Sequence, residues 1–235
     1  MNCGEENSMG KENNTANQKN KLKVLNVGAA TGRTSEILSQ YGEVTSLEFD
    51  KDCCDFANNN LNLNIINGSI LELPFANETF DIVCAFDVIE HVEDDLTAVA
   101  EMKRVCKNGG LIAVTVPAFM SLWSQHDVVN HHFRRYTNAN LLQLFDDIKL
   151  KPTTATYFNT LLFSPIFIFR MLGKLVPQKW IRKGAGSDAT IMKEEGVLNS
   201  LLYHIFGAEL FLLKYMKLPF GVSIFLALTK DDKPL

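Results

Sequence analysis

Apolar runs without polar alternation constrain the fold of this chain more than any other feature. Residues 24–27, 80–86 and 111–116 are built mainly from Val, Ile, Leu, Ala and Phe. Strands of this kind are buried on both faces, as in a parallel sheet between two layers of helices. Because segments of helical length separate these runs, the sequence predicts a doubly wound, Rossmann-like α/β fold.

The expected sheet has seven strands, is mostly parallel and carries helices on both faces. A helical insertion is expected before its last strand. The strands are expected at residues 23–28, 43–49, 64–69, 80–86, 111–117, about 149–157 and 222–230. The helices of the core are expected at residues 33–41, 51–61, 93–110 and 138–148.

The chain divides into four parts on composition. Residues 1–20 are rich in Asn, Glu and Lys and offer little to bury, which predicts a disordered tail without a signal peptide. Residues 21–157 form the expected α/β core, 158–220 the helical insertion, and 221–235 the last strand of the core.

Charge and cysteine content limit the classes of binding partner and the cellular compartment that are expected. A net charge of −4 supplies no field that would hold a polyanion, so no nucleic-acid partner is expected. The five cysteines are odd in number and lack the spacing of a metal site or a disulfide framework. Reduced thiols and a cytoplasmic location are therefore expected.

A glycine turn joins the first strand to its helix. Gly28 and Gly32 lie in this turn, and Glu48 ends the next strand. Backbone N–H groups at a helix N-terminus and an acid at this distance suit the phosphate or ribose of an adenosine-containing cofactor. The dinucleotide pattern G-x-G-x-x-G is absent, because Ala30 and Arg33 occupy its second and third glycine positions. A tight turn without a ligand is the structural alternative.

Four stretches together resemble a known family. "VLNVGAATGRTSEIL", "VTSLEFD", "NGSILELPFANETFDIVCAFDVIEHV" and "EMKRVCKNGGLIAVTVP" look like the successive motifs of class I S-adenosylmethionine-dependent methyltransferases of the small-molecule type. The resemblance covers Lys23 to Pro117 in order and implies a cofactor-binding core that uses S-adenosylmethionine and releases S-adenosylhomocysteine.

The resemblance also implies which residues bind the cofactor. The glycine turn would wrap the methionine part, the acid would accept the ribose hydroxyls, and the residues after the third and fourth strands would line the adenine and the methionine. These residues are Gly28, Ala29, Ala30, Thr31, Gly32, Glu48, Phe49, Ser69, Ile70, Phe86, Asp87 and His91.

Two departures from the family pattern keep alternatives open. Asn26 stands where an acid is usual, and Ala30 stands where a glycine is usual. A catalytically silent domain that binds the cofactor or serves as a scaffold is therefore the second hypothesis. A nicotinamide-dependent oxidoreductase is the third, and the missing third glycine disfavours it.

A histidine- and arginine-rich stretch follows the fifth strand and would border the reacting methyl group. It matches the run D-x-x-x-x-H-x-R-R-Y-T of some of these methyltransferases from Asp127 to Thr137. The candidate catalytic residues, for proton removal from an acceptor, are His132, His126, His91 and Tyr136. An ion pair between Asp127 and Arg135, with Tyr136 and Trp123 packed beneath it, is the structural alternative.

No metal site is expected in this stretch. Adjacent His131 and His132 would diverge on a strand, and no second cluster of ligands is visible in the sequence.

The insertion is the most apolar part of the chain, but charges and Pro165 interrupt it well short of a membrane span. Amphipathic helices that close over the site would suit an apolar, aromatic or lipid-linked acceptor, with Tyr157, Phe158 and Asn159 facing the site. Core completion and a dimer face are the alternatives. The sequence thus predicts a methyltransferase for a small or lipid-like acceptor, monomeric or homodimeric, with peripheral membrane contact as an option.

Overall fold

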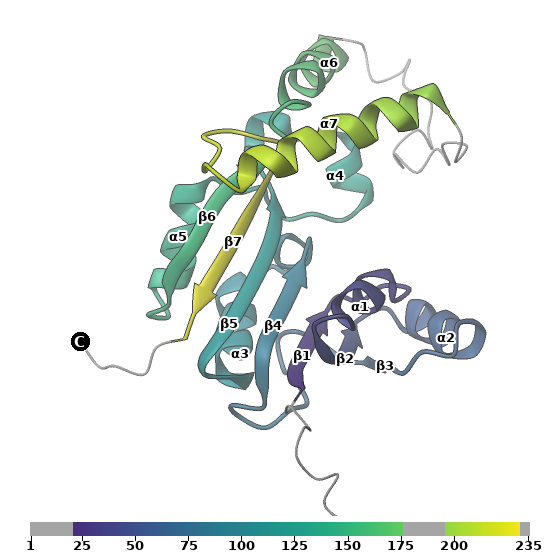
Figure 1. The fold of residues 1–235 in the computed structure, drawn as a ribbon, viewed down its shortest axis with the longest axis vertical. Helices are drawn as coiled ribbons and strands as arrows, with labels where there is room; N and C mark the ends of the chain where they lie inside the picture. Colours follow the sequence, from purple (N-terminus) through teal and green to yellow (C-terminus); the bar gives the residue numbers. More distant parts are fainter. Residues whose placement is uncertain (1–20, 176–195, 231–235) are drawn as a thin grey trace, which may run out of the picture.

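Seven strands form one sheet in the order β3-β2-β1-β4-β5-β7-β6 (Figure 1). The computed structural model describes residues 21–175 and 196–230. The strands are β1 (Leu22–Val27), β2 (Gly42–Glu48), β3 (Ile65–Asn67), β4 (Phe80–Phe86), β5 (Cys106–Pro117), β6 (Lys151–Phe158) and β7 (Ser223–Thr229). The helices are α1 (Arg33–Leu38), α2 (Lys51–Asn60), α3 (Asp95–Val105), α4 (Gln125–Val129), α5 (Asn138–Asp146), α6 (Phe163–Leu175) and α7 (Val197–Leu213), with short 3-10 turns η1 (Ile89–His91) and η2 (Met120–Leu122).

Parallel pairing places the carboxyl ends of the central strands side by side. β1 pairs with β2 and with β4, so that Val27 lies opposite both Leu47 and Ala85. β4 pairs with β5 in parallel, whereas β7 runs antiparallel to both β5 and β6. The described strands therefore form the mostly parallel, seven-stranded sheet that the sequence predicts.

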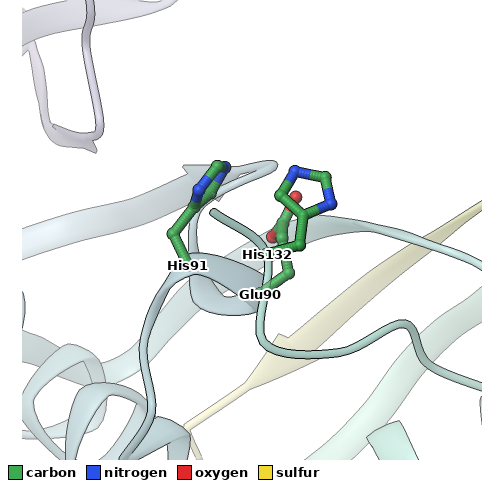
Figure 2. A group of neighbouring side chains, drawn as sticks. All are labelled: Glu90, His91 and His132. Atoms are coloured by element: carbon green, nitrogen blue, oxygen red, sulfur yellow. The ribbon is translucent and has the colours of Figure 1, made fainter. Parts of the chain in front are cut away.

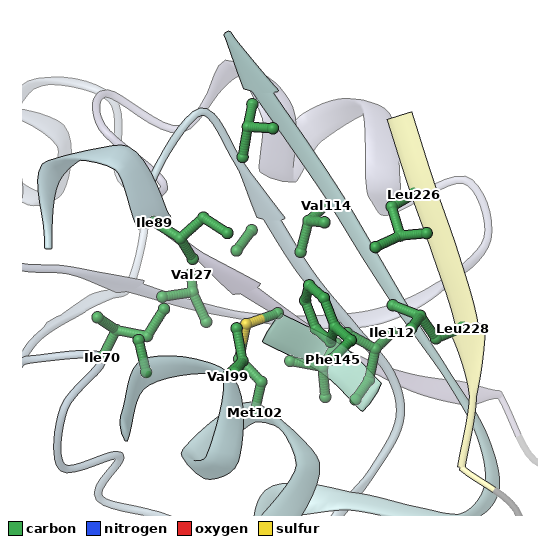
Figure 3. Packing of buried hydrophobic residues seen from close by; sticks show 14 of the residues in the cluster. Val27, Ile70, Ile89, Val99, Met102, Ile112, Val114, Phe145, Leu226 and Leu228 are labelled. Carbon is green, nitrogen blue, oxygen red and sulfur yellow. The ribbon is translucent and has the colours of Figure 1, made fainter. Parts of the chain in front are cut away.

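Side chains of the buried strands alternate between two helical layers. Leu25 and Val27 of β1 face the main core with α3 and α5, whereas Val24 packs with Leu38 of α1 on the opposite face. Figure 3 shows the main core, where Val99 and Met102 of α3 and Phe145 of α5 meet strands β4, β5 and β7. Burial on both faces explains the absence of polar alternation in these strands.

The boundary between α3 and β5 differs from the sequence prediction. A helix over residues 93–110 is wrong: α3 ends at Val105 and the chain enters β5 at Cys106. Gly109 adopts a φ of +75°, which the helix would not allow, and its N–H donates to the carbonyl of Lys230 at 2.6 Å. Hydrogen bonding with neighbouring segments of the sheet thus outweighs the helix-like distribution of charged residues in this stretch.

The helices α6 and α7 follow β6 and precede β7, and Figure 1 shows them beyond one end of β5, β6 and β7. Phe163 of α6 contacts the rings of Phe119 and Phe220, and Arg170 donates to the carbonyl of Leu122. Glu209 of α7 is buried and accepts from the N–H of Leu161 at 3.2 Å. Among the described residues, no helix combines the length and apolarity that crossing a membrane requires. The predicted tail at residues 1–20 lies outside the described residues.

Removal of the Phe145 ring tests the packing of α5 on the sheet. Phe145 is fully buried in the main core, so Phe145→Ala should lower the free energy of unfolding by about 3–5 kcal/mol through lost burial and a new cavity. Denaturant unfolding followed by circular dichroism measures this. Phe169→Ala is the matched control, because the Phe169 side chain of α6 is 78% exposed and its loss should change stability by less than about 0.5 kcal/mol. Equal losses in the two variants would contradict this arrangement.

Candidate active site

A cavity of about 590 Å³ opens at the carboxyl ends of β1, β2 and β4. This is the position at which open α/β sheets bind ligands. Its wall contains eight of the predicted site residues, namely Gly28, Ala30, Glu48, Phe49, Ser69, Ile70, Asp87 and His91. Parallel pairing of these strands, and of β3 with β2, thus brings the predicted glycine turn, ribose acid and adenine contacts to one place.

The glycine turn passes so close to Val88, which follows β4, that a side chain at position 28 would not fit. Gly28 has a φ of +74°, and a Cβ built on it would lie 2.4 Å from Cγ2 of Val88. Its N–H donates to the carbonyl of Leu47 at 2.8 Å. Gly32 has a φ of +94° and precedes the first residue of α1. Gly28 therefore adds only backbone atoms to the cavity wall, and its missing side chain leaves room for Val88.

Glu48 joins the turn to the end of β2. Its Oε2 accepts from the N–H of Ala30 at 2.8 Å, and its Oε1 accepts from the N–H of Asp50 at 2.9 Å. A carboxylate has about four lone-pair sites, so these two bonds orient the group and leave acceptor capacity for a ligand's hydroxyls. Asp50 then caps α2, because its side chain accepts from the N–H groups of Asp52 and Cys53.

The two departures from the family pattern have distinct structural consequences. Ala30 adopts a φ of +47°, the left-handed region in which an alanine Cβ is strained. Asn26 is buried, and its side-chain amide donates to Ser35 Oγ at 2.9 Å, which in turn bonds Ser46 Oγ at 2.7 Å. Asn26 thus fastens α1 to β1 and β2, and it lies outside the cavity wall.

Asp87 and His91 form the wall on the β4 side. Burial raises the pKa of Asp87, with a hydrogen bond to Thr115 and the nearby His132 and Arg135 opposing the shift. Partial desolvation by the surrounding protein lowers the pKa of His91, and the neighbouring His132 adds to this, which favours the neutral ring. A neutral imidazole can accept a proton or bind a metal ion.

Asp127 organises the stretch that follows β5. It is fully buried, and its Oδ1 accepts from Arg135 Nε at 2.7 Å and contacts His132 Nδ1 at 2.9 Å. Its Oδ2 accepts from the N–H of Ser124 at 2.8 Å. Burial alone would raise the pKa of Asp127, but the hydrogen bond and charge of Arg135 lower it overall. The predicted ion pair between Asp127 and Arg135 is confirmed, and the same carboxylate also orients His132.

This stretch is attached directly to η1. The N–H of Phe133 donates to the carbonyl of Glu90 at 2.8 Å, and Phe133 itself lines the cavity. The rings of His91 and His132 meet edge to face with their centroids 4.5 Å apart. Glu90, His91 and His132 consequently form one group of side chains (Figure 2). These groups come from different loops, so no such cluster is visible in the sequence.

The remaining candidates lie away from the cavity wall. The hydroxyl of Tyr136 donates to Asp95 at 2.8 Å, and burial raises its pKa, so it is poorly suited to proton transfer. His126 contacts Asn130 at 2.9 Å and lies 6.2 Å from His132, centroid to centroid. Ala29, Thr31, Gly32 and Phe86 belong to the same turn and strand end without lining the cavity.

The expectation for the end of β6 is not supported by the described residues. Tyr157 stacks on Phe119 with ring centroids 5.1 Å apart, and its hydroxyl accepts from the N–H of Asn138. The cavity wall contains none of Tyr157, Phe158 and Asn159. It also contains no described residue of α6 or α7.

Several residues of the cavity wall were not among the predicted site residues. They include Asp50, Gly68, Leu71, Val88, Val92, Glu93 and Phe133. Asp50 directly follows Glu48 and Phe49, so its position in "EFD" was a usable signal. Phe133 had no comparable signal, because only the contact between its loop and η1 places it at the cavity.

Comparisons with known proteins agree with this geometry. Residues 25–114 match the family model described as "Methyltransferase domain". A demethylmenaquinone methyltransferase of Staphylococcus aureus (strain MRSA252) is 29% identical over 117 residues, which is 44% of this chain and 48% of the relative. The chain thus matches about half the length of such curated relatives.

Two solved structures show the same fold across most of the chain. A protein of Bacillus halodurans C-125, described as a methyltransferase, superposes with a TM-score of 0.56 at 17% identity and covers 91% of this chain and 94% of its own. Phosphoethanolamine N-methyltransferase 2 of Haemonchus contortus, solved in complex with S-adenosyl-L-methionine, gives a TM-score of 0.58 at 13% identity and covers 92% of this chain and 50% of its own.

The sequence match and the strand order therefore agree: residues 25–114 match the methyltransferase-domain family model, and the sheet that they help to form has the strand order and fold of class I S-adenosylmethionine-dependent methyltransferases.

Proposed function

We propose that this protein transfers a methyl group from S-adenosylmethionine to a small, apolar, aromatic or lipid-linked acceptor. The observation that carries the proposal is the cavity in which the Gly28 turn and the Glu48 carboxylate meet. Its volume of about 590 Å³ lies within the range of roughly 300–1,000 Å³ that is usual for small-molecule sites.

The residues of the wall fit the cofactor group by group. Gly28 lines the cavity with backbone atoms alone, which suits close approach of the methionine part. Glu48 offers acceptor capacity for two ribose hydroxyls. Ile70, Leu71 and Phe49 supply apolar surface for adenine beside the hydroxyl of Ser69.

When bound, the cofactor supplies an electrophilic methyl group, and the protein has to align an acceptor and remove its proton. Asp127 bonds Nδ1 of His132, which leaves Nε2 of the ring available to an acceptor. His132 contacts His91, and His91 lies on the cavity wall. The two histidines therefore mark the acceptor end of the site.

A lipid-linked acceptor is supported by the apolar side chains of α6 and α7 that lie outside the cavity wall and suit contact with a lipid surface. Phe169 of α6 and Tyr203, Leu210 and Phe211 of α7 are each more than half exposed. Such side chains suit contact with a lipid surface or an apolar ligand. The staphylococcal relative is named for demethylmenaquinone, which makes that compound the first acceptor to try.

A catalytically silent cofactor-binding domain is the second candidate, and Ala30 favours it. The strained φ of +47° at Ala30 carries a free-energy cost in the loop that would contact the cofactor. Weak cofactor binding without turnover is the result that this candidate predicts.

Thermal unfolding with S-adenosylhomocysteine tests the proposal first. Ligand at about a hundred times its dissociation constant adds about 2.7 kcal/mol to stability, which should raise the unfolding midpoint by about 5–10 °C. NAD, measured in parallel, should produce no shift. A shift with NAD alone would reject the cofactor assignment, and a shift with S-adenosylhomocysteine without turnover on demethylmenaquinone or other quinones would favour the silent domain.

Glu48→Ala tests the placement of the ribose. Loss of a charged acceptor should weaken S-adenosylhomocysteine binding about tenfold to a hundredfold, as measured by isothermal titration calorimetry. Glu43→Ala is the matched control, because Glu43 lies exposed near the opposite end of the same strand. If both variants bind the ligand as tightly as the wild type, the ribose lies elsewhere.

His132→Ala tests the acceptor end of the site. Turnover should fall by about a hundredfold or more, while affinity for S-adenosylhomocysteine stays close to that of the wild type. His131→Asn is the control, since it removes the adjacent, exposed imidazole and asparagine tolerates the φ of +56° at that position. Parallel losses of turnover and affinity in His132→Ala would show a purely structural role.

A further inference from the structure

Glu90 is the most unusual polar side chain among the described residues. It is fully buried, yet neither Oε1 nor Oε2 has a hydrogen-bond partner. A buried carboxyl group without a partner costs free energy, and most such groups in folded proteins are paired or bind a metal ion. The position of Glu90 therefore requires an explanation.

Two imidazoles lie beside this carboxyl group. A carboxylate oxygen of Glu90, a ring nitrogen of His91 and a ring nitrogen of His132 all lie within 4.8 Å of one another. In Figure 2 the Glu90 carboxyl group lies behind the His132 ring, and the His91 ring faces them from η1. Ligands 2.0–2.2 Å from a shared ion lie about 3.3–3.6 Å apart in a tetrahedral site, so small side-chain movements would complete the set.

Both histidines already have the outer partners that metal-binding histidines usually have. The carboxylate of Asp127 lies 2.9 Å from Nδ1 of His132, and Arg135 and Ser124 hold that carboxylate. The backbone of Asn130 lies near the ring of His91. Carboxylate and backbone contacts of this kind fix the ring orientation and leave the other nitrogen for the ion.

We propose that Glu90, His91 and His132 bind one divalent metal ion of the zinc type at the edge of the cavity. Two imidazoles and one carboxylate are a donor set that such ions accept, and calcium or magnesium would prefer more oxygen ligands. Metal binding requires the neutral form of both imidazoles.

Three protein ligands leave a fourth position open. His91 lies on the cavity wall, so this position can take water or an oxygen atom of an acceptor. Binding of an acceptor's oxygen atom at this position rests on the proposed function, whereas metal binding itself does not. In the metal-bound protein, His91 and His132 act as metal ligands and no longer as proton acceptors.

Cobalt titration of the metal-free protein, without cofactor, tests the site directly. Co²⁺ bound to three protein ligands should produce visible absorption bands that saturate at one equivalent, and Zn²⁺ should abolish them. Glu90→Gln, His91→Ala and His132→Ala should each weaken Co²⁺ binding at least tenfold, with folding checked by circular dichroism. His91 is an exposed position, so its variant should fold normally even where the buried Glu90 variant does not.

Two variants keep the test specific. His131→Asn removes the imidazole next to His132, and His204→Ala removes an exposed imidazole on α7. Both should bind Co²⁺ like the wild type. No saturable absorption in the wild type, unchanged binding by His91→Ala, or loss of binding only in His204→Ala would each overturn the proposal. Because S-adenosylhomocysteine is measured separately, failure of the metal site and failure of the cofactor site give different results.

Discussion

The parallel pairing of β2, β1 and β4 determines where the candidate site lies. The register that sets Val27 opposite both Leu47 and Ala85 brings three strand ends to one edge of the sheet. The chain must turn sharply there, and Gly28 makes the turn with its N–H on the carbonyl of Leu47. Glu48 lies at the same edge. The position of the cavity therefore follows from the parallel pairing of strands that are buried on both faces.

Sequence patterns predicted this half of the molecule because they depend on local chemistry. Unbroken apolar runs mark the buried strands, and an acid one strand further on identifies Glu48. The acceptor half depends on contacts between distant segments, such as the bond from Phe133 N–H to the Glu90 carbonyl. No periodicity encodes such a contact, so the loop residue Phe133 and the cluster around Glu90 were not predicted. The predicted end of α3 was wrong for the same reason, because the N–H of Gly109 donates to the carbonyl of Lys230, near the end of the described residues.

The loop between β1 and α1 shows how a strained residue is held in place. Ala30 keeps a left-handed conformation that costs about 1–2 kcal/mol relative to glycine. Its N–H donates to Glu48 Oε2, and Glu48 is fixed a second time by Asp50. The charged acceptor therefore offsets the strain and holds the turn open toward the cavity. Ala30 and Glu48 act as one unit, which explains how the loop retains its shape without the usual middle glycine.

Two buried carboxyl groups near the histidines have opposite environments. Asp127 has three partners in Arg135, His132 and Ser124, so its charge is compensated and its pKa is lowered. Glu90 has no side-chain partner, and burial together with the charge of Asp87 raises its pKa well above the usual range. Removal of Arg135 would strand one buried charge at a cost of about 3–5 kcal/mol. A cation between Glu90 and the two histidines would give the second carboxylate the compensation that Arg135 gives the first.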